Sequence, residues 1–518
     1  MVLKPLLITS VLLIFCIGLR ASDLLKSSLT VEPNHPVLLE LECLPSLKIV
    51  YQELSYQESW TLAKAHKAVK LFKQSELEGL NPSDYHLNEL ELLAKNWPKS
   101  QDQLTRLDLL LSDGLLLLCS HMLSGKVDPV SLDKQYGVKR REGNPIELLK
   151  EFIKDGDVQV LKNKITPKHS IYQNLKLALA AYLELQKAEE KIEITAGTAI
   201  KKGNQDTRLE AIKKRLIFLG DLEKSDVIDD RYDNLTFEAV IQFQKRHGLE
   251  AEGLIGAQTI ERLNVSVSYR VEQLKANLER WRWLPNQLGD FYLIVNIANF
   301  ELEVYKSGLK ERTHKIIAGK PARKTPVFNA TMKTVVFNPD WTVPPGIIRG
   351  DLVPGVKKDI ELLSRKNISV YDGSGQLLDA KKIDWNDPKV YSYTYKQPPG
   401  KDCALGAVKF LFPNSHHVYL HDTPSKELFN STERAFSSGC IRVERPLELA
   451  QYLLDNPSYT SSKIQAIVET NKTQNISLVN QPEVYLLYWT AWRDDNGKTH
   501  FRKDIYARDE ALIQALKQ

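Results

Sequence analysis

The spacing of apolar positions divides the chain into a helical part and a strand-rich part. Between about 40 and 200, stretches such as "LTRLDLLLSDGLLLLCSHML" and "YQNLKLALAAYLELQKAEEKIE" repeat apolar residues at helical intervals between Pro, Gly and Asn turns. From residue 291 the pattern changes to strand alternation, in "FYLIVNIANFELEVYKSG", "KTVVFN", "AVKFLF" and "HVYLHD". We therefore expect a multi-domain α+β protein, with an all-helical scaffold domain over 23–200 and a β-rich domain over 291–470.

A compact helical module is predicted between these two parts. One apolar stripe at helical spacing stops at Gly220, a second stops at Gly248, and Ile260 and Leu263 begin a third. Three short helices of this kind form a small bundle, which we place at 201–268. A helix containing "LERWRWLP" then serves as a linker over 269–290.

Two segments of the β-rich part depart from simple alternation. Residues 346–404 are rich in Pro, Gly and charge and show no sustained strand pattern, so we expect a lid insertion there. After "PLELAQYLLD", which reads as a helix, residues 471–518 complete the domain. Within them "EVYLLYWTAWRDDNGKTHFRKDIY" predicts two strands about an Asn496-Gly497 hairpin turn.

The first 22 residues have the pattern of an export signal. Lys4 precedes an apolar run that ends at Leu19, and small and polar residues follow. An uncleaved anchor in the inner membrane is the alternative, although the run is shorter than the roughly 20 residues that a membrane span needs. In either case we expect the protein outside the cytoplasm, a location that in a Gram-negative bacterium would be the periplasm.

Composition and charge narrow the possible classes of function. The chain has 518 residues, of which 42% are apolar and 26% charged, and its formal charge is +5. Basic and acidic residues are mixed along the chain, so nothing favours nucleic-acid binding. No CxxC or His-rich cluster suggests a metal, and we expect no metal or other cofactor. Export would leave four cysteines in an oxidising compartment, and two disulfides are then the default expectation. These are Cys43, Cys119, Cys403 and Cys440.

The segment "HDTPSKELFNSTERAFSSGCIRVERP" carries the candidate chemistry. A thiol is a strong nucleophile only as thiolate, and a nearby histidine or a helix N-terminus lowers its pKa. His421 ends a strand pattern, and we expect Cys440 in a loop just before a helix. Gly439 would let the backbone approach a substrate carbonyl, so that the amides of Cys440 and its neighbour stabilise an oxyanion. Spacing alone leaves open a loop cysteine and a surface histidine that never meet.

Two regions resemble families that act on the bacterial cell wall. "AVIQFQKRHGL…EGLIGAQTIERLN" resembles the peptidoglycan-binding domain, although Glu252-Gly253 replaces the usual Asp-Gly. Residues 291–515 resemble the L,D-transpeptidase catalytic domain through "HDTP" and "SSGCIRV", with His421 and Cys440 19 positions apart. Three further strings resemble segments of the same catalytic domain: "GKPARKTPVF", "FNPDWTVPP" and "LGAVKFLFPN". Nearly the whole exported chain thus resembles the large lid-bearing L,D-transpeptidases of Gram-negative bacteria.

The resemblance implies roles for individual residues. Cys440 would be the nucleophile and His421 its base, with the main-chain carbonyl of Asp422 orienting the ring. Asp422 stands where smaller members have glycine, and whether its side chain adds an electrostatic partner stays open. Ser438 stands where many members have histidine, a change that large members tolerate. Three further residues are candidates for substrate binding. Arg442 has a salt bridge within the fold as its alternative, and Trp341 has core packing. Tyr419, two residues before His421 on the same strand face, would line the pocket.

The function implied is the formation of 3→3 cross-links in peptidoglycan. A tetrapeptide stem would acylate Cys440 as a thioester with loss of D-alanine, and an amine of a second stem would then attack. Peptidoglycan is the expected partner. Peptidoglycan synthases are possible further partners, which the sequence leaves open. Two rivals are an L,D-carboxypeptidase that uses water and a non-catalytic wall-binding protein with a degenerate site. The intact His421, Gly439, Cys440 and Arg442 argue against the second rival.

Overall fold

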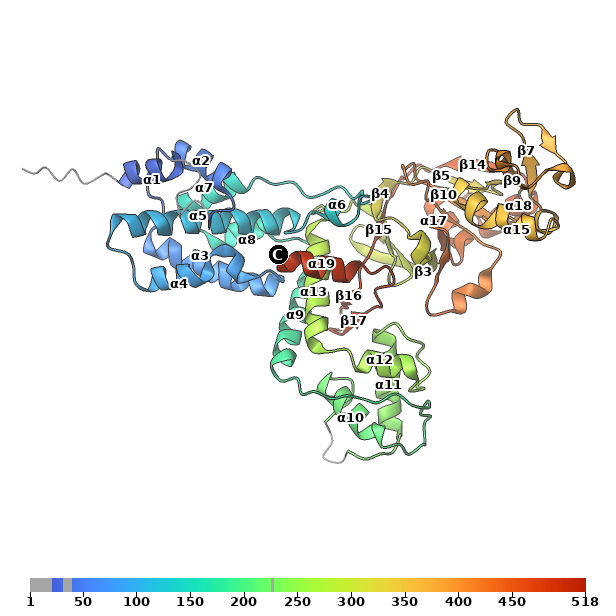
Figure 1. The fold of residues 1–518 in the computed structure, drawn as a ribbon. Coiled ribbons are helices and arrows are strands. Elements are labelled where there is room, and N and C mark those ends of the chain that lie inside the picture. The colour runs from blue at the N-terminus through green and yellow to red at the C-terminus, as the bar shows by residue number, and fades with distance from the viewer. Residues whose placement is uncertain (1–20, 31–39, 225–227) are drawn as a thin grey trace, which may run out of the picture. The chain divides into compact units, whose positions relative to one another are not determined.

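The computed structural model describes residues 21–30, 40–224 and 228–518, and the chain forms two compact units (Figure 1). The first unit comprises residues up to Glu76, Leu80–Met122 and Gly143–Thr166. The second comprises Leu77–Gly79, Leu123–Glu142 and Pro167–Gln518. Apart from its last two positions, which begin a helix, the predicted export signal lies outside the described residues.

The first unit is built from helices, as the apolar spacing predicts. Its long helix α5 (Gln101–Ser124) is apolar enough to span a membrane by length and composition, but 83% of its most apolar window is buried in the protein. Buried Asp108 accepts hydrogen bonds from the amides of Ser59 and Trp60, and Asp113 accepts one from the Cys43 amide. The other helices are α1 (Ala21–Thr30), α2 (Leu44–Glu53), α3 (Leu62–Gln74), α4 (Leu87–Lys95), α7 (Pro145–Asp155) and α8 (Val158–Ile165).

The second unit contains the expected three-helix module. Its helices are α10 (Arg208–Phe218), α11 (Asn234–Arg246) and α12 (Ala257–Leu263), which bury one apolar cluster that includes Leu216, Phe243 and Leu263. Gly220 and Gly248 follow the first two helices at φ +75° and +66°. Glycine adopts this left-handed conformation without a steric cost, so both residues end their helices as predicted.

The helix expected as a linker is part of a buried scaffold. Helix α13 (Val267–Arg282) packs along α9 (Ser170–Lys187) and against the C-terminal helix α19 (Arg508–Lys517). Two of its buried polar side chains pair with the C-terminal segment: Arg280 with Asp509 at 2.7 Å, and Asn277 with Thr490 at 2.9 Å. Breaking one partner of a buried pair is costly, so these contacts hold the helix firmly to the C-terminal segment.

An eleven-stranded sheet forms the β-rich domain. The strand order is β14-β5-β10-β11-β13-β3-β2-β1-β15-β4, and β12 pairs with β3. Bounds of the first half of this order are β14 (Gln474–Ser477), β5 (Thr334–Phe337), β10 (Val408–Leu411), β11 (Leu420–His421) and β13 (Ile441–Val443). Those of the second half are β3 (Leu309–Gly319), β2 (Glu301–Lys306), β1 (Phe291–Asn296), β15 (Glu483–Leu487) and β4 (Phe328–Thr331), with β12 at Ala435–Ser437. Helix α17 (Pro446–Leu454) lies where "PLELAQYLLD" predicts it, and α18 (Ser461–Glu469) packs on it.

The C-terminal segment differs from its predicted pair of strands. Residues 483–506 contain three strands, because β15 leaves the hairpin and pairs with β1 and β4 in the large sheet. The hairpin itself, β16 (Ala491–Arg493) and β17 (Thr499–Phe501), is antiparallel about the predicted Asn496-Gly497 turn. The apolar run in "EVYLLYW" is therefore a buried strand between two neighbours.

The insertion expected at 346–404 is a folded subdomain with strands, which the sequence pattern did not indicate. It has its own apolar core around Val353, Val370 and Tyr395. Its four-stranded sheet has the order β6-β9-β7-β8. These strands are β6 (Trp341–Thr342), β7 (Ser369–Tyr371), β8 (Leu377–Leu378) and β9 (Thr394–Gln397). Its helices are α14 (Pro345–Ile347), a π-helix at Ile348–Leu352, α15 (Val353–Lys358) and α16 (Leu362–Arg365). Strands of two to four residues are too short to produce a clear alternation.

The expectation of two disulfides is wrong for this structure. Cys43, Cys119, Cys403 and Cys440 are all free thiols. Cys119 is fully buried on the apolar helix α5, as expected, and burial alone raises the pKa of its thiol. The fold therefore relies on its packed cores and buried polar pairs.

We predict unequal effects for two glycine substitutions with the same backbone strain. Gly125 and Gly203 have φ of +90° and +87°, so alanine should cost about 1–2 kcal/mol at either position. A Cβ at Gly125 would lie 2.5 Å from Trp283 Nε1 and 2.6 Å from Glu279 Oε1, whereas Gly203 faces open space. Gly125→Ala should therefore lose a further ~1–3 kcal/mol in urea unfolding. Equal losses of stability in the two variants would contradict the close packing around Gly125.

Candidate active site

Strand pairing brings the two halves of the candidate motif together. Strand β11 runs parallel to β13, with His421 opposite Arg442, and Cys440 directly precedes β13. His421 and Cys440 line one cleft of about 600 Å³. The two residues thus share one cleft, unlike a loop cysteine and a distant surface histidine. The helix expected directly after Cys440 is wrong: three strand residues follow, and α17 begins only at Pro446.

His421 is held in one tautomer. The ring is 5% exposed, and Nδ1 lies 2.5 Å from the main-chain carbonyl oxygen of Asp422. A carbonyl can only accept, so Nδ1 carries the proton and Nε2 is free to accept one. Burial and then the nearby Arg442 charge lower the pKa of His421 to about 3. The imidazole is therefore neutral at physiological pH.

The carboxylate of Asp422 serves the fold around the histidine. It accepts hydrogen bonds from the amides of Ala407 at 2.8 Å and Thr423 at 2.7 Å, and it forms an ion pair with Lys426. The side chain thus fixes the loops on either side of β11. Its main-chain carbonyl makes the contact with His421, as the resemblance implies.

The Cys440 thiol does not have the low pKa expected from the sequence. Burial raises its pKa above the usual value of about 9, and this effect outweighs hydrogen bonds to Tyr419 and the charge of Arg442, which lower it. The Sγ donates weakly to the His417 carbonyl oxygen at 3.9 Å. The resting pair is therefore a neutral thiol beside a neutral imidazole, and proton transfer has to accompany attack on the substrate.

The backbone at Gly439 offers one oxyanion donor where two were expected. Gly439 has φ +119°, which favours glycine, and its carbonyl oxygen accepts from Thr325 Oγ1 at 2.8 Å. Its amide donates to Ser437 Oγ at 3.1 Å, and the Ile441 amide donates to the Tyr419 carbonyl at 3.2 Å. Both neighbouring amides are thus used, and the Cys440 amide is the one for which the described residues record no acceptor.

The other candidates for substrate binding lie on the wall of the cleft. The Tyr419 ring stands 5.6 Å from the His421 ring at 64°, and Trp341 pairs with Gln397 at the edge of the lid subdomain. Arg442 reaches the cleft with a buried Nε that has no hydrogen-bond partner. Trp341, Tyr419, His421, Ser438, Cys440 and Arg442 all line the cleft, whereas Gly439 and Asp422 support it from behind.

Sequence reasoning missed Arg323, which connects the lid to the catalytic loop. Its Nη1 donates to Ser438 Oγ at 2.9 Å and pairs with Asp351 of the lid. Arg323 belongs to "GKPARKTPVF", so the matching string was the available signal, but only the fold shows that its guanidinium faces Ser438. Positive side chains predominate around the cleft: five cations line it, compared with two carboxylates, those of Asp351 and Asp402. The five are Lys320, Arg323, Arg365, Lys366 and Arg442.

Comparisons with protein families agree with this organisation. A model described as "L,D-transpeptidase catalytic domain" matches residues 290–468, "Putative peptidoglycan binding domain" matches 205–263, and "Scaffold domain" matches 45–179. A Haemophilus influenzae protein described as "Putative L,D-transpeptidase" is 35% identical over 272 residues. That alignment covers 51% of this chain and 54% of the relative, so the chain spans about half the length of the curated relative that it matches.

Solved structures include two similar L,D-transpeptidases. The protein from Xylanimonas cellulosilytica is 14% identical, with 57% of this chain and 100% of that chain covered and a TM-score of 0.18. The protein from Stackebrandtia nassauensis is 12% identical, with 57% and 97% covered and a TM-score of 0.21.

We predict that a small thiol reagent modifies Cys440 far faster than Cys403, because Cys440 opens to the cleft and Cys403 is 1% exposed. The rate should rise with pH as the thiolate forms. Arg442 lowers the pKa of the thiol, so Arg442→Gln should move the pH midpoint upward by about one unit. Arg445→Gln, which removes an exposed cation beyond the cleft, is the control. Peptide mapping by mass spectrometry gives both the site and the rate, and an unchanged midpoint in Arg442→Gln would contradict this electrostatic role.

Proposed function

We propose that this chain, whose catalytic domain belongs to the L,D-transpeptidase family, joins peptide stems of peptidoglycan by 3→3 cross-links through a thioester on Cys440. The observation that carries the proposal is the shared cleft, which is lined by both the Cys440 thiol and a neutral His421 whose Nδ1 is already bonded to a carbonyl. That arrangement supplies a nucleophile and an oriented base.

Acylation needs the thiol proton to leave as the sulfur attacks. Nε2 of His421 takes this proton while Sγ bonds to the carbonyl carbon of the third stem residue, and the Cys440 amide stabilises the oxyanion. The C–N bond to D-alanine then breaks, and His421 returns the proton to the departing amine. A thioester remains, and both side chains are neutral again.

Transfer to the second stem repeats these steps with an amine as nucleophile. His421 accepts a proton from the side-chain amine of the acceptor stem as its nitrogen attacks the thioester. The C–S bond breaks, the proton passes to the sulfur, and the free thiol is regenerated with a new amide bond. Arg442 stabilises the thiolate that attacks in the first stage and leaves in the second, whereas the same charge opposes protonation of His421, so the proton stays on the imidazole only briefly.

The charge around the cleft supports an anionic substrate. Peptide stems carry several carboxylates, and five cations against two carboxylates line this cleft. Guanidinium groups match carboxylate geometry, so Arg442, with its unpartnered Nε, is the candidate that binds a stem carboxylate. We infer that the protein acts outside the cytoplasm on peptidoglycan, with the three-helix module holding it on the polymer.

The proposal predicts a specific product. Incubation of the protein with tetrapeptide muropeptides should give 3→3 dimers and free D-alanine, detected by mass spectrometry. Cys440→Ala should give neither, whereas Cys403→Ala should keep both because Cys403 donates to the Pro339 carbonyl away from the cleft wall. Tripeptides without dimers would identify water as the acceptor and a carboxypeptidase activity. Dimers formed by Cys440→Ala would contradict the mechanism.

The histidine should set an unusual pH dependence. Its pKa of about 3 means that the base form persists well below pH 6.5, the value of an ordinary histidine. A carbapenem resembles the acyl donor and typically acylates the cysteine of this family. Its reaction with Cys440 should therefore show no acidic midpoint near pH 6.5, and the rate should fall only as the pH approaches 3. His421→Ala should slow acylation by about 10²-fold without preventing folding. A midpoint near pH 6.5 in the native protein would contradict the assigned environment.

A further inference from the structure

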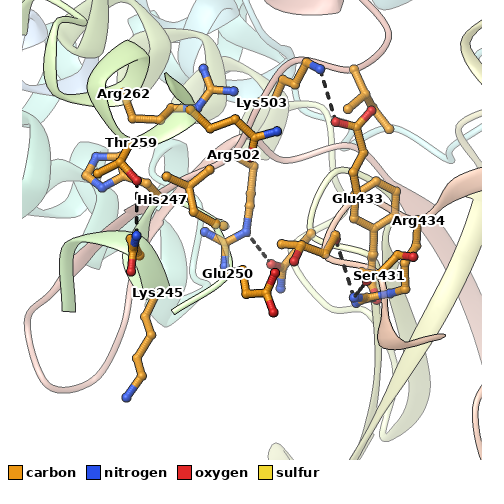
Figure 2. A pocket seen from close by; sticks show the side chains of 18 of the residues that line it. Lys245, His247, Glu250, Thr259, Arg262, Ser431, Glu433, Arg434, Arg502 and Lys503 are labelled. Carbon is orange, nitrogen blue, oxygen red and sulfur yellow. Dashed lines mark hydrogen bonds and ion pairs between the residues drawn. The ribbon is translucent and has the colours of Figure 1, made fainter. Parts of the chain in front are cut away.

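A second large hollow lies on the other side of the strand that leads to the catalytic loop. It measures about 890 Å³, and its walls come from the end of α11 and α12 of the module on one side and from the catalytic domain on the other (Figure 2). We call it the module groove. The catalytic wall is formed by 298–301, 431–436 and 502–505, with Lys315.

The two walls are fixed to each other by direct contacts. Arg502 is held on the catalytic wall by Asn299, whose Oδ1 accepts from Nε at 2.6 Å. Its Nη1 donates across the groove to the carbonyl oxygen of Arg246, the last residue of α11, at 3.1 Å. His247 stacks on Phe501 with ring centroids 5.8 Å apart and 20° between planes. Gly248 makes room for Arg502, because a Cβ there would lie 2.5 Å from the arginine Cδ. The groove is therefore preformed.

The charge of the groove differs from that of the catalytic cleft. Positive and negative groups are nearly balanced, and some neutralise each other directly, as Lys503 and Glu433 do at 3.1 Å. The cations are Lys245, Arg262, Lys315, Arg434, Arg502 and Lys503. The anions are Glu250, Glu252, Glu261, Glu301 and Glu433. A balanced wall of donors and acceptors suits a neutral ligand that is rich in hydroxyl and amide groups.

One aromatic face completes the groove. Phe436 lines it and is 44% exposed, although a phenylalanine usually avoids water. An exposed aromatic ring among fixed polar groups is typical of ligand sites with a flat, partly apolar ligand surface. Sugar rings present such a surface, with C–H groups on the face and hydroxyls at the rim.

Strand β12 separates the groove from the catalytic cleft. Ala435 and Phe436 line the groove, whereas Ser437 and Ser438 line the cleft that holds Cys440. From Phe436 to Cys440 is four residues (440 − 436), which span at most about 14 Å of extended chain. Three residues of a peptide stem span at most about 11 Å. The reach of such a stem is thus of the same order as the greatest possible separation of Phe436 from Cys440.

We propose that the module groove binds the sugar chain of the donor strand while the attached peptide stem crosses β12 into the catalytic cleft. This proposal rests on the proposed function, since it names the part of the same substrate that the cleft does not bind. The neutral sugar chain occupies the balanced groove, and the anionic stem occupies the cationic cleft. The module thus contributes one wall of the donor site in addition to holding the enzyme on the polymer.

The test compares two donors that share the stem and differ in the sugar. Initial rates are measured with soluble sugar chains carrying tetrapeptide stems and with the free tetrapeptide. Phe436→Ala changes the catalytic wall of the groove, and Glu250→Ala changes the exposed carboxylate on the module wall. Each variant should raise KM for the sugar-bearing donor about 5-fold or more beyond any change for the free tetrapeptide.

Matched controls are exposed leucines outside the groove. Leu235→Ala on the module and Leu309→Ala on β3 remove side chains that are 76% and 70% exposed, and both should leave the ratio of the two KM values unchanged. If groove variants change KM for both donors equally, or for neither, the groove does not bind the sugar chain and the proposal is wrong.

A binding measurement separates this proposal from the proposed function. Calorimetry with Cys440→Ala protein and the sugar chains needs no turnover. Binding that Phe436→Ala and Glu250→Ala weaken about 5-fold supports the groove even if the native protein turns over neither donor, an outcome that would refute only the proposed function. Binding that neither substitution weakens overturns the groove proposal, whatever the activity.

Discussion

The parallel pairing of β11 with β13 is the constraint on which the active site depends. It places His421 opposite Arg442 and puts Cys440 at the entry of the same pair. A slip of one residue would turn every side chain of a strand to the other face of the sheet. Both strands are only two or three residues long, so their register depends on the neighbours β10 and β3, to which they are also paired. The large sheet therefore acts as the template that brings two distant segments into chemical contact.

Burial and one positive charge determine the protonation of the catalytic pair. Burial favours the neutral form of both groups, since it raises the pKa of Cys440 and lowers that of His421. The charge of Arg442 counteracts the effect of burial on the pKa of Cys440 and adds to the effect of burial on the pKa of His421. An isolated Cys440 is thereby kept from ionising fully before a substrate arrives. As a consequence, the thiol must lose its proton within the enzyme–substrate complex. The fixed tautomer of His421, with Nε2 unprotonated, can accept that proton.

The catalytic cleft and the module groove, two cavities of the second unit, differ in the charge of their walls, and the proposed division of the substrate rests on this difference. The cationic cleft fits carboxylate-bearing peptide, and the balanced groove fits a neutral chain, with β12 as their common wall. The contacts of Arg502 and the buried pairs of α13 give the module a fixed place beside this wall. A module connected only by a flexible linker could raise the local substrate concentration but could not share a binding site.

The sequence by itself determined the features that local patterns encode. Apolar spacing predicted the helical scaffold, the three-helix module and its glycine stops, strands β1, β2, β5 and β10, and the Asn496-Gly497 turn. The motif around His421 and Cys440 identified the pair and the family that the catalytic domain resembles. Local patterns suffice there because periodicity and turn chemistry act between residues close in the chain.

Only the tertiary structure decided the features that depend on contacts between distant segments. It replaced the helix expected after Cys440 by β13, because pairing with β11 and β3 outweighs any local preference in three residues. It left the four thiols unpaired, raised the pKa of Cys440 through burial, and used the amides of Gly439 and Ile441 within the fold. Burial, pairing and charge proximity arise from three-dimensional packing, and sequence spacing alone carries no measure of them.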